Sequence, residues 1–257
     1  MRYIVLLVLL GIATSFTVQK QKPVIYLVGD STVKNGSGKG DSGLWGWGDF
    51  LYTQFDTTKV RIENHARGGR SSRTYQTEGL WHNVLANVKP GDYIIMQFGH
   101  NDGGAINDTL RARGSIRGIG EETEEIDNLI THKHEIVHSY GWYMRKYIRD
   151  AKAKGAIPIV CSLVARNVWK DGKVVRSTDS YATWAADVAK AEGAYYIDLN
   201  DLVASRYEQL GPEEVKSKLF LEDHTHTTEA GARINAALVA EAIRGEKKLA
   251  LRKFLRV

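Results

Sequence analysis

Five short runs of mostly apolar residues are spread along the chain, and most of them are separated by amphipathic stretches of helical period. The runs cover residues 24–28, 60–64, 93–98, 157–164 and 195–199. Strands that alternate with helices form a parallel sheet covered on both faces, because each crossover helix packs back onto the sheet. The pattern therefore predicts an α/β fold, a three-layer α/β/α sandwich with a central parallel sheet.

One segment departs from this alternation. Residues 103–139 are polar and dotted with glycine, and unstructured loops of that length are rare in compact domains. We expect an insertion with its own hairpin over one rim of the sheet. No repeat or linker divides the rest, so residues 18–257 are predicted to form one domain. Its last helix should begin at Thr227 or Thr228 and end at Gly245.

The first residues have the pattern of a secretory signal peptide. Arg2 precedes an apolar run from Tyr3 to Ala13, and small residues follow. A core strand and a membrane anchor are the alternatives, but the run is short for a membrane span. Residues 1–17 are therefore predicted to direct the protein to the periplasm or the medium, with no membrane association after their removal.

The formal net charge of +5 would favour an acidic partner such as a polyuronic acid. Arginine and lysine are scattered, and no helix-turn-helix or zinc-finger spacing occurs, so we expect no nucleic-acid partner. The sequence does not define the oligomeric state.

The stretch HEIVH, which begins at His134, matches the zinc-protease pattern H-E-x-x-H. In a helix His134 and His138 could share one zinc ion, whereas in a strand they would lie about 13 Å apart. Ile136 and Val137 are β-branched, and Gly141 disfavours a helix. These residues predict an extended segment, a helix that begins after Gly141, and no metal site. A zinc metalloprotease remains a distant alternative.

A candidate nucleophile follows the first predicted strand, in the stretch GDSTV that begins at Gly29. Ser31 lies at the carboxyl rim of the sheet, where ligands gather in such folds. A turn or cap serine would occupy the same position, and the G-x-S-x-G elbow of α/β-hydrolases is missing. Whether Ser31 is catalytic therefore depends on whether the sequence also supplies a base and oxyanion donors near it.

Polar residues near the other strand ends could activate this serine. In DHTHTT, the Asp223 carboxylate can reach Nδ1 of His226 across a tight turn, which leaves Nε2 to accept a proton. His224 is the alternative base. The stretches NHARGGRSS and QFGHND supply Gly69 and Asn101, whose N–H groups could bind an oxyanion. Both could instead be turn residues.

GDST, the glycine of GGRS, the asparagine of GHND and the D-x-x-H of DHTHTT occur in the order of the four blocks of the SGNH (GDSL-type) hydrolases. More narrowly, GDSTV, WGWGDF, NHARGGRSSRTY, FGHND and DHTHTTEAGA resemble the rhamnogalacturonan acetylesterases, a similarity that spans residues 23–245. The resemblance implies a flavodoxin-like fold and a serine esterase that removes acetyl groups from pectic polysaccharide through an acetyl-enzyme. It implies no metal or organic cofactor.

The resemblance also implies a role for each residue of the site. Ser31 would be the nucleophile, His226 the general base and then acid, and Asp223 the residue that orients His226. The oxyanion hole would consist of the backbone N–H groups of Ser31 and Gly69 and the side chain of Asn101. The segment of residues 103–139 is longer than in compact members of the family, which leaves the exact substrate open.

An acetylated acidic polysaccharide would need residues that bind it. Arg70 and Arg73 could hold galacturonate carboxylates, and Trp47 or Trp45 could stack on a sugar. Surface charge and core packing are the alternatives for these residues. Other basic residues of the rim loops are Lys34, Lys39, Arg67, Arg111, Arg113 and Arg117.

Other functions are compatible with the same residues. Within the fold, a lipase or thioesterase would prefer long acyl chains, and another carbohydrate esterase would act on a different polymer. A carbohydrate-binding module that is not catalytic would bind polymer and hydrolyse no ester.

Overall fold

The computed structural model describes residues 21–256, and the predicted signal peptide lies outside them. A five-stranded parallel sheet with the order β2-β1-β3-β6-β9 forms the centre. Its strands are β1 (Val24–Gly29), β2 (Arg61–Asn64), β3 (Tyr93–Gln97), β6 (Ile157–Cys161) and β9 (Tyr195–Ile197). Each strand falls within one of the five predicted runs or extends it by one residue, which confirms the predicted parallel sheet.

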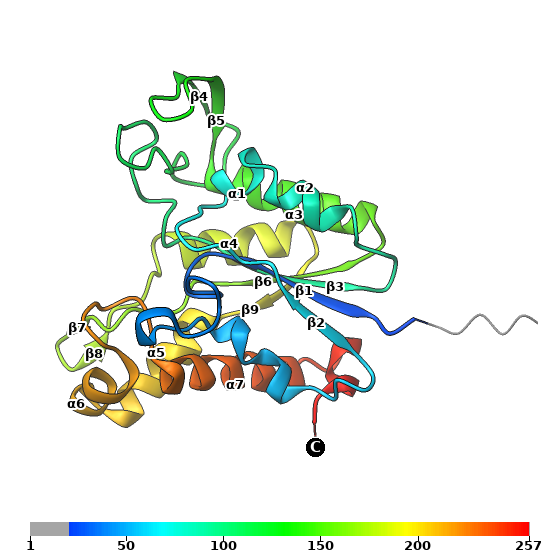
Figure 1. Cartoon of the computed structure of the whole chain (residues 1–257), viewed down its shortest axis with the longest axis vertical. Helices are drawn as coiled ribbons and strands as arrows, with labels where there is room; N and C mark the ends of the chain where they lie inside the picture. Colours follow the sequence, from blue (N-terminus) through cyan, green and yellow to red (C-terminus); the bar gives the residue numbers. More distant parts are fainter. Residues whose placement is uncertain (1–20, 257) are drawn as a thin grey trace, which may run out of the picture.

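Helices cover both faces of the sheet (Figure 1). One face carries α1 (Thr74–Thr77), α2 (Leu80–Leu85), α3 (Tyr140–Ala153) and α4 (Tyr181–Ala191), and the other carries α5 (Leu199–Leu210) and α7 (Glu229–Gly245). The predicted three-layer α/β/α sandwich is therefore confirmed. Helix α7 has the predicted ends, because the Thr228 side chain caps it by accepting the Gly231 N–H and the helix stops at Gly245.

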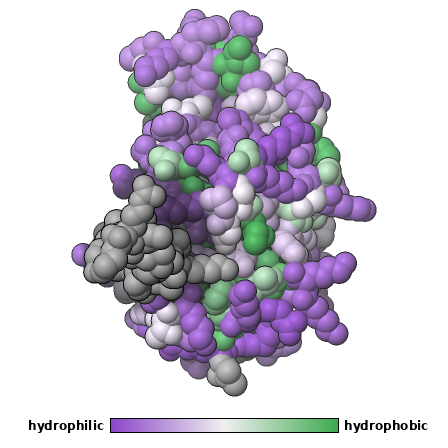
Figure 2. Space-filling view, turned by 90° about the vertical axis from the view of Figure 1, so that its right-hand side faces the viewer, coloured by the Kyte–Doolittle hydropathy of each residue, from purple (hydrophilic) through white to green (hydrophobic). Residues whose placement is uncertain are grey.

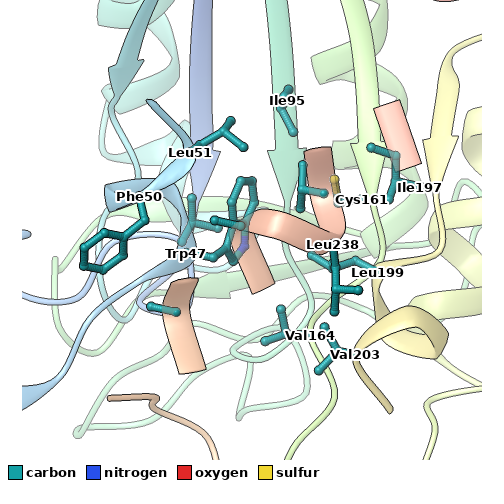
Figure 3. Close-up of a cluster of buried hydrophobic side chains, with 14 of the residues drawn as sticks. Trp47, Phe50, Leu51, Ile95, Cys161, Val164, Ile197, Leu199, Val203 and Leu238 are labelled. Atoms are coloured by element: carbon teal, nitrogen blue, oxygen red, sulfur yellow. The ribbon is translucent and has the colours of Figure 1, made fainter. Parts of the chain in front are cut away.

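The core has two halves because side chains of a strand alternate between the faces of the sheet. Ile25 and Leu27 of β1 pack with the residues of α5 and α7, and Tyr26 and Val28 pack with those of α3 and α4. Figure 3 shows the first half, in which Trp47, Cys161 and Leu238 lie among other buried side chains. A strand buried on both faces needs a continuous apolar run, which explains why the sequence pattern located the strands.

Smaller elements complete the described chain. The strands β4 (Thr123–Asp127) and β5 (His134–His138) form one hairpin, and β7 (Trp169–Lys170) and β8 (Lys173–Val174) form another. The short helical segments are Asp41–Gly43, Trp47–Asp49, Leu51–Gln54, α6 (Pro212–Glu214), Val215–Leu219 and Ala250–Phe254.

The HEIVH stretch is the strand β5, as predicted, and it pairs antiparallel with β4. His134 and His138 therefore lack the helical spacing that two zinc ligands would need. No group of three or more His, Cys, Asp or Glu residues within 21–256 is arranged to hold a metal ion. One prediction is wrong: α3 begins at Tyr140, before Gly141. Glycine fits there because a Cβ atom would lie only 2.5 Å from the Cα atom of Ile119.

The predicted insertion does carry a hairpin, since β4 and β5 project beyond the helical layer (Figure 1). Backbone hydrogen bonds close the first part of the insertion into a loop: the Gly114 N–H donates to Ala105 O at 2.8 Å, and the Ser115 N–H donates to Asp102 O at 3.0 Å. Only glycine fits at position 114, because a Cβ atom there would lie 2.0 Å from the carbonyl oxygen of Gly104. The next residue, Ile116, donates its N–H to His138 O at 3.0 Å, which joins this loop to the end of the insertion.

The surface at the amino end of β1 is mostly hydrophilic (Figure 2). Outside the area covered by grey residues, hydrophilic residues predominate there and hydrophobic ones are scattered. None of the described helices is long and apolar enough to cross a bilayer.

Candidate active site

Ser31 lies in a tight turn directly after β1. Gly29 ends the strand where the chain passes close to β3, and a Cβ atom there would lie 2.6 Å from Gln97 O. Asp30 is fully buried, and its Oδ1 atom accepts hydrogen bonds from the N–H and Oγ1–H of Thr32 at 2.8 and 2.7 Å. These contacts fix the turn and present the Ser31 side chain at the carboxyl rim of the sheet.

The loop before α7 brings Asp223 and His226 to this serine, although 195 residues separate Ser31 and His226 in sequence. His226 Nε2 lies 2.9 Å from Ser31 Oγ, and His226 Nδ1 lies 2.6 Å from Asp223 Oδ2. If Nδ1 carries the ring proton, Nε2 can accept the proton of the serine hydroxyl. The structure therefore brings together the three residues predicted to form a catalytic triad.

The same loop stabilises the charge of Asp223. Burial of Asp223 opposes its ionisation, but hydrogen bonds from the His226 ring and from the backbone N–H groups of His226 and Thr225 outweigh burial. Together they hold the pKa of the Asp223 carboxyl at about 2. Asp223 is thus ionised under any ordinary condition and can stabilise a protonated imidazole.

His224, the alternative base, does not approach the serine. Its Nδ1 atom lies 2.9 Å from Thr225 Oγ1, and it is absent from the residues that line the cleft around Ser31. The geometry therefore favours His226 as the base.

Gly69 and Asn101, predicted to bind an oxyanion, line the same cleft as Ser31. Gly69 has φ 76°, in the left-handed region that favours glycine. The buried Asn101 side chain donates one N–H to Arg70 O at 2.8 Å, which leaves its second N–H for another acceptor. The arrangement is suited to an oxyanion hole, the role that the sequence predicts for these residues.

The cleft around these residues has a volume of about 370 Å³. It is lined by Ser31, Asn35, Gly36, Gly68, Gly69, His100, Asn101, Arg111, Arg113, Arg166, Thr225 and His226. Arg166 and His100 were not among the residues predicted from the sequence to form the site. The position of Arg166 in the sequence could have indicated a place in the site, because Arg166 follows the carboxyl end of β6 just as Asn101 follows that of β3.

The predictions that Arg73 and Trp47 bind substrate are wrong, because both side chains are buried. Arg73 pairs with Glu135 through Nε and Nη2 at 2.6 and 2.7 Å, which ties the insertion to the rest of the chain. The Trp47 indole donates to Gln97 Oε1 at 2.8 Å within the core (Figure 3). Arg70 is partly exposed, but its guanidinium pairs with Glu78 at 2.9 Å, and it does not line the cleft.

We predict that kcat/KM for a small ester falls about tenfold per pH unit on the acidic limb of its pH profile. His226 must be neutral to accept a proton, whereas Asp223, with a pKa of about 2, stays ionised. Asp223 should therefore not contribute to the acidic limb, so that a single protonation, that of the general base, accounts for the slope. A profile measured from about pH 4 to 9 checks this, and a rate that stays flat below about pH 5 would contradict it.

Comparisons with known proteins place the chain in a family of hydrolases. The family model for the GDSL-like lipase/acylhydrolase family matches residues 27–234. A rhamnogalacturonan acetylesterase of Emericella nidulans is 33% identical over 220 residues, which cover 85% of this chain and 84% of that one. The rhamnogalacturonan acetylesterase RhgT of Bacillus subtilis is 29% identical over 239 residues, which cover 87% and 90% of the two chains.

Solved structures show the same fold. The structure of the protein YxiM from Bacillus subtilis superposes with a TM-score of 0.71 at 26% identity; the match covers 88% of this chain but only 57% of that one. An acetylxylan esterase from Geobacillus stearothermophilus superposes with a TM-score of 0.58 at 17% identity, over 86% and 94% of the two chains. From the family model and the relatives at about 30% identity, the chain belongs to the GDSL-like lipase/acylhydrolase family.

Proposed function

We propose that the protein is a serine esterase that removes O-acetyl groups from pectic polysaccharide, rhamnogalacturonan in particular. The observation that carries the reaction type is the contact of Ser31 Oγ with His226 Nε2 at 2.9 Å, with Asp223 behind the imidazole. The substrate class is supported by the relatives named rhamnogalacturonan acetylesterases.

The first half of the reaction forms an acetyl-enzyme. Ser31 Oγ attacks the acetyl carbonyl carbon while its proton moves to His226 Nε2. The carbonyl oxygen becomes an oxyanion, and the N–H groups of Ser31, Gly69 and Asn101 are the donors that would stabilise it. The bond between the carbonyl carbon and the sugar oxygen then breaks, and the sugar hydroxyl leaves with the proton from His226.

The second half regenerates the enzyme by the same steps. Water gives a proton to His226 Nε2 and attacks the acetyl carbon, and the resulting oxyanion collapses to release acetate and the Ser31 hydroxyl. All groups that take part in these reaction steps belong to the chain, the substrate or water, so the proposed reaction requires no cofactor.

The lining of the cleft favours a short acyl group on a polar substrate. Its residues are glycine, polar side chains, two histidines and three arginines, without a large aliphatic or aromatic side chain. A long acyl chain would bury apolar surface against charged groups there, with little gain from the hydrophobic effect. This observation supports an acetylesterase over a lipase or a long-chain thioesterase.

The sequence of the amino terminus supports export. Residues 1–17 have the charge and apolar run of a signal peptide. The protein would then act in the periplasm or the medium, where it could meet plant polysaccharide.

Acetate release from two polymers of equal acetyl content tests the proposed function. We expect acetylated rhamnogalacturonan to be deacetylated with a kcat/KM at least about tenfold above that for acetylated xylan, and a long-chain ester to be hydrolysed poorly. Equal rates on both polymers would indicate a general carbohydrate esterase. A preference for the long-chain ester would indicate a lipase.

A further inference from the structure

Three arginines surround the proposed nucleophile. Arg111 and Arg113 come from the insertion, Arg166 comes from the loop after β6, and all three line the cleft that contains Ser31 and His226. Within residues 21–256, none of the three has a carboxylate within ion-pair distance, whereas arginines such as Arg149 and Arg176 do.

Hydrogen bonds of the insertion hold Arg111 and Arg113 in place. Asp108 Oδ1 accepts the backbone N–H groups of Leu110, Arg111 and Ala112 at 2.9, 2.6 and 2.8 Å. Arg113 Nη1 donates to Gly69 O at 3.3 Å, so this guanidinium lies against the predicted oxyanion glycine. The charges are therefore directed toward the cleft by a defined loop.

Arg166 reaches the cleft from a different loop, the one after β6. The N–H of its neighbour Asn167 donates to His224 O at 2.8 Å, which holds the Arg166 loop against the loop that carries His226. Arg166 and the proposed base, His226, thus line the cleft from two loops that are hydrogen-bonded to each other.

Three like charges in one cleft repel one another unless an anion joins them. Burial and the nearby Arg111 lower the pKa of Arg113, and the charges of Asp30, Asp102 and Asp108 offset only part of this effect. Of the buried carboxylates that act on Arg113, Asp30 is already engaged with His100 at 3.2 Å and with Thr32, and Asp102 accepts hydrogen bonds from Ser72 and Ser115. A cleft with unpaired guanidinium groups is complementary to a carboxylate, which they can bind by paired N–H donors.

We propose that Arg111, Arg113 and Arg166 bind the carboxylate of a uronic acid in the sugar segment that carries the acetyl ester. This inference rests on the proposed function and deepens it, because it makes negative charge next to the ester a condition for efficient turnover. The insertion then acts as a specificity element: it supplies two of the three charges.

Polymer kinetics give the first test. The measured quantity is kcat/KM on acetylated rhamnogalacturonan divided by kcat/KM on 4-nitrophenyl acetate. We expect this ratio to fall about tenfold in Arg111→Gln and about tenfold in Arg166→Gln, because KM for the polymer rises. Arg113 is left intact because it touches Gly69. The matched control is Arg117→Gln, an insertion arginine that lies over the Trp184 ring at 5.4 Å and does not line this cleft, and its ratio should not change.

Inhibition gives a second test that needs no polymer turnover. Oligogalacturonate should inhibit hydrolysis of 4-nitrophenyl acetate by the wild type, with an inhibition constant about tenfold weaker in each variant, and neutral xylo-oligosaccharide should not inhibit. If oligogalacturonate inhibits through the arginines but acetylated rhamnogalacturonan is not deacetylated, the inference holds and the proposed substrate is wrong. If the polymer is deacetylated but the variants match Arg117→Gln in both tests, the inference is wrong and the proposed function stands.

Discussion

Replacement of His226 by alanine is expected to lower kcat for ester hydrolysis by about 10⁴-fold or more. The Ser31 hydroxyl would lose the proton acceptor that lies 2.9 Å away, and the sugar leaving group would lose its proton donor. Residual activity should reflect only binding and the oxyanion donors. The measurement is kcat on 4-nitrophenyl acetate, with the Tm recorded to show that the variant is folded.

His224→Ala is the matched control, because the two histidines are two residues apart. The His224 side chain contacts Thr225 and does not line the cleft, so its removal should change kcat by less than about threefold. Loss of activity in His224→Ala with retention in His226→Ala would reverse the assignment of the base.

Replacement of Arg73 by methionine is expected to lower the free energy of unfolding by about 3 kcal/mol or more. Arg73 is fully buried and pairs with Glu135, whose side chain is only 16% exposed. It also donates to the carbonyl oxygens of Ile106 and Gly114, both at 2.8 Å. Methionine would fill the space but would leave a partly buried carboxylate and two carbonyl groups without their donor. Urea unfolding measures the change.

Two further variants separate this effect from a general loss of charge. Arg70→Met removes the exposed pair with Glu78 and should cost less than about 1 kcal/mol. Adding Glu135→Gln to Arg73→Met should recover part of the lost stability, because no unpaired charge remains. An Arg73→Met variant as stable as Arg70→Met would contradict the anchoring role of Arg73.

The fold was largely predictable because its signals are local. A buried parallel strand must be apolar throughout, and the last helix has Thr228 as its cap and Gly245 at its end. The start of α3 was not predictable from propensity, because the reason for Gly141 is the distant backbone of Ile119. The position of the insertion followed from its composition, but the closed loop of residues 102–115 within it did not.

The site was predictable to the extent that its residues lie at strand ends. Ser31, Gly69 and Asn101 follow β1, β2 and β3, and the parallel sheet brings them to one rim. Residues whose burial depends on a distant partner were misjudged: Arg73 meets Glu135, 62 residues away, and Trp47 meets Gln97, 50 residues away. Sequence position alone cannot show that a charged or aromatic side chain near the rim points into the core.

The most direct test of the proposed function is acetate release from acetylated rhamnogalacturonan by the wild type and by Ser31→Ala. Ser37→Ala, an exposed serine that hydrogen-bonds to Asp41, serves as the control. We expect the wild type and Ser37→Ala to release acetate at similar rates and Ser31→Ala to release none above the uncatalysed rate. Acetate release that survives in Ser31→Ala would contradict the serine-esterase mechanism.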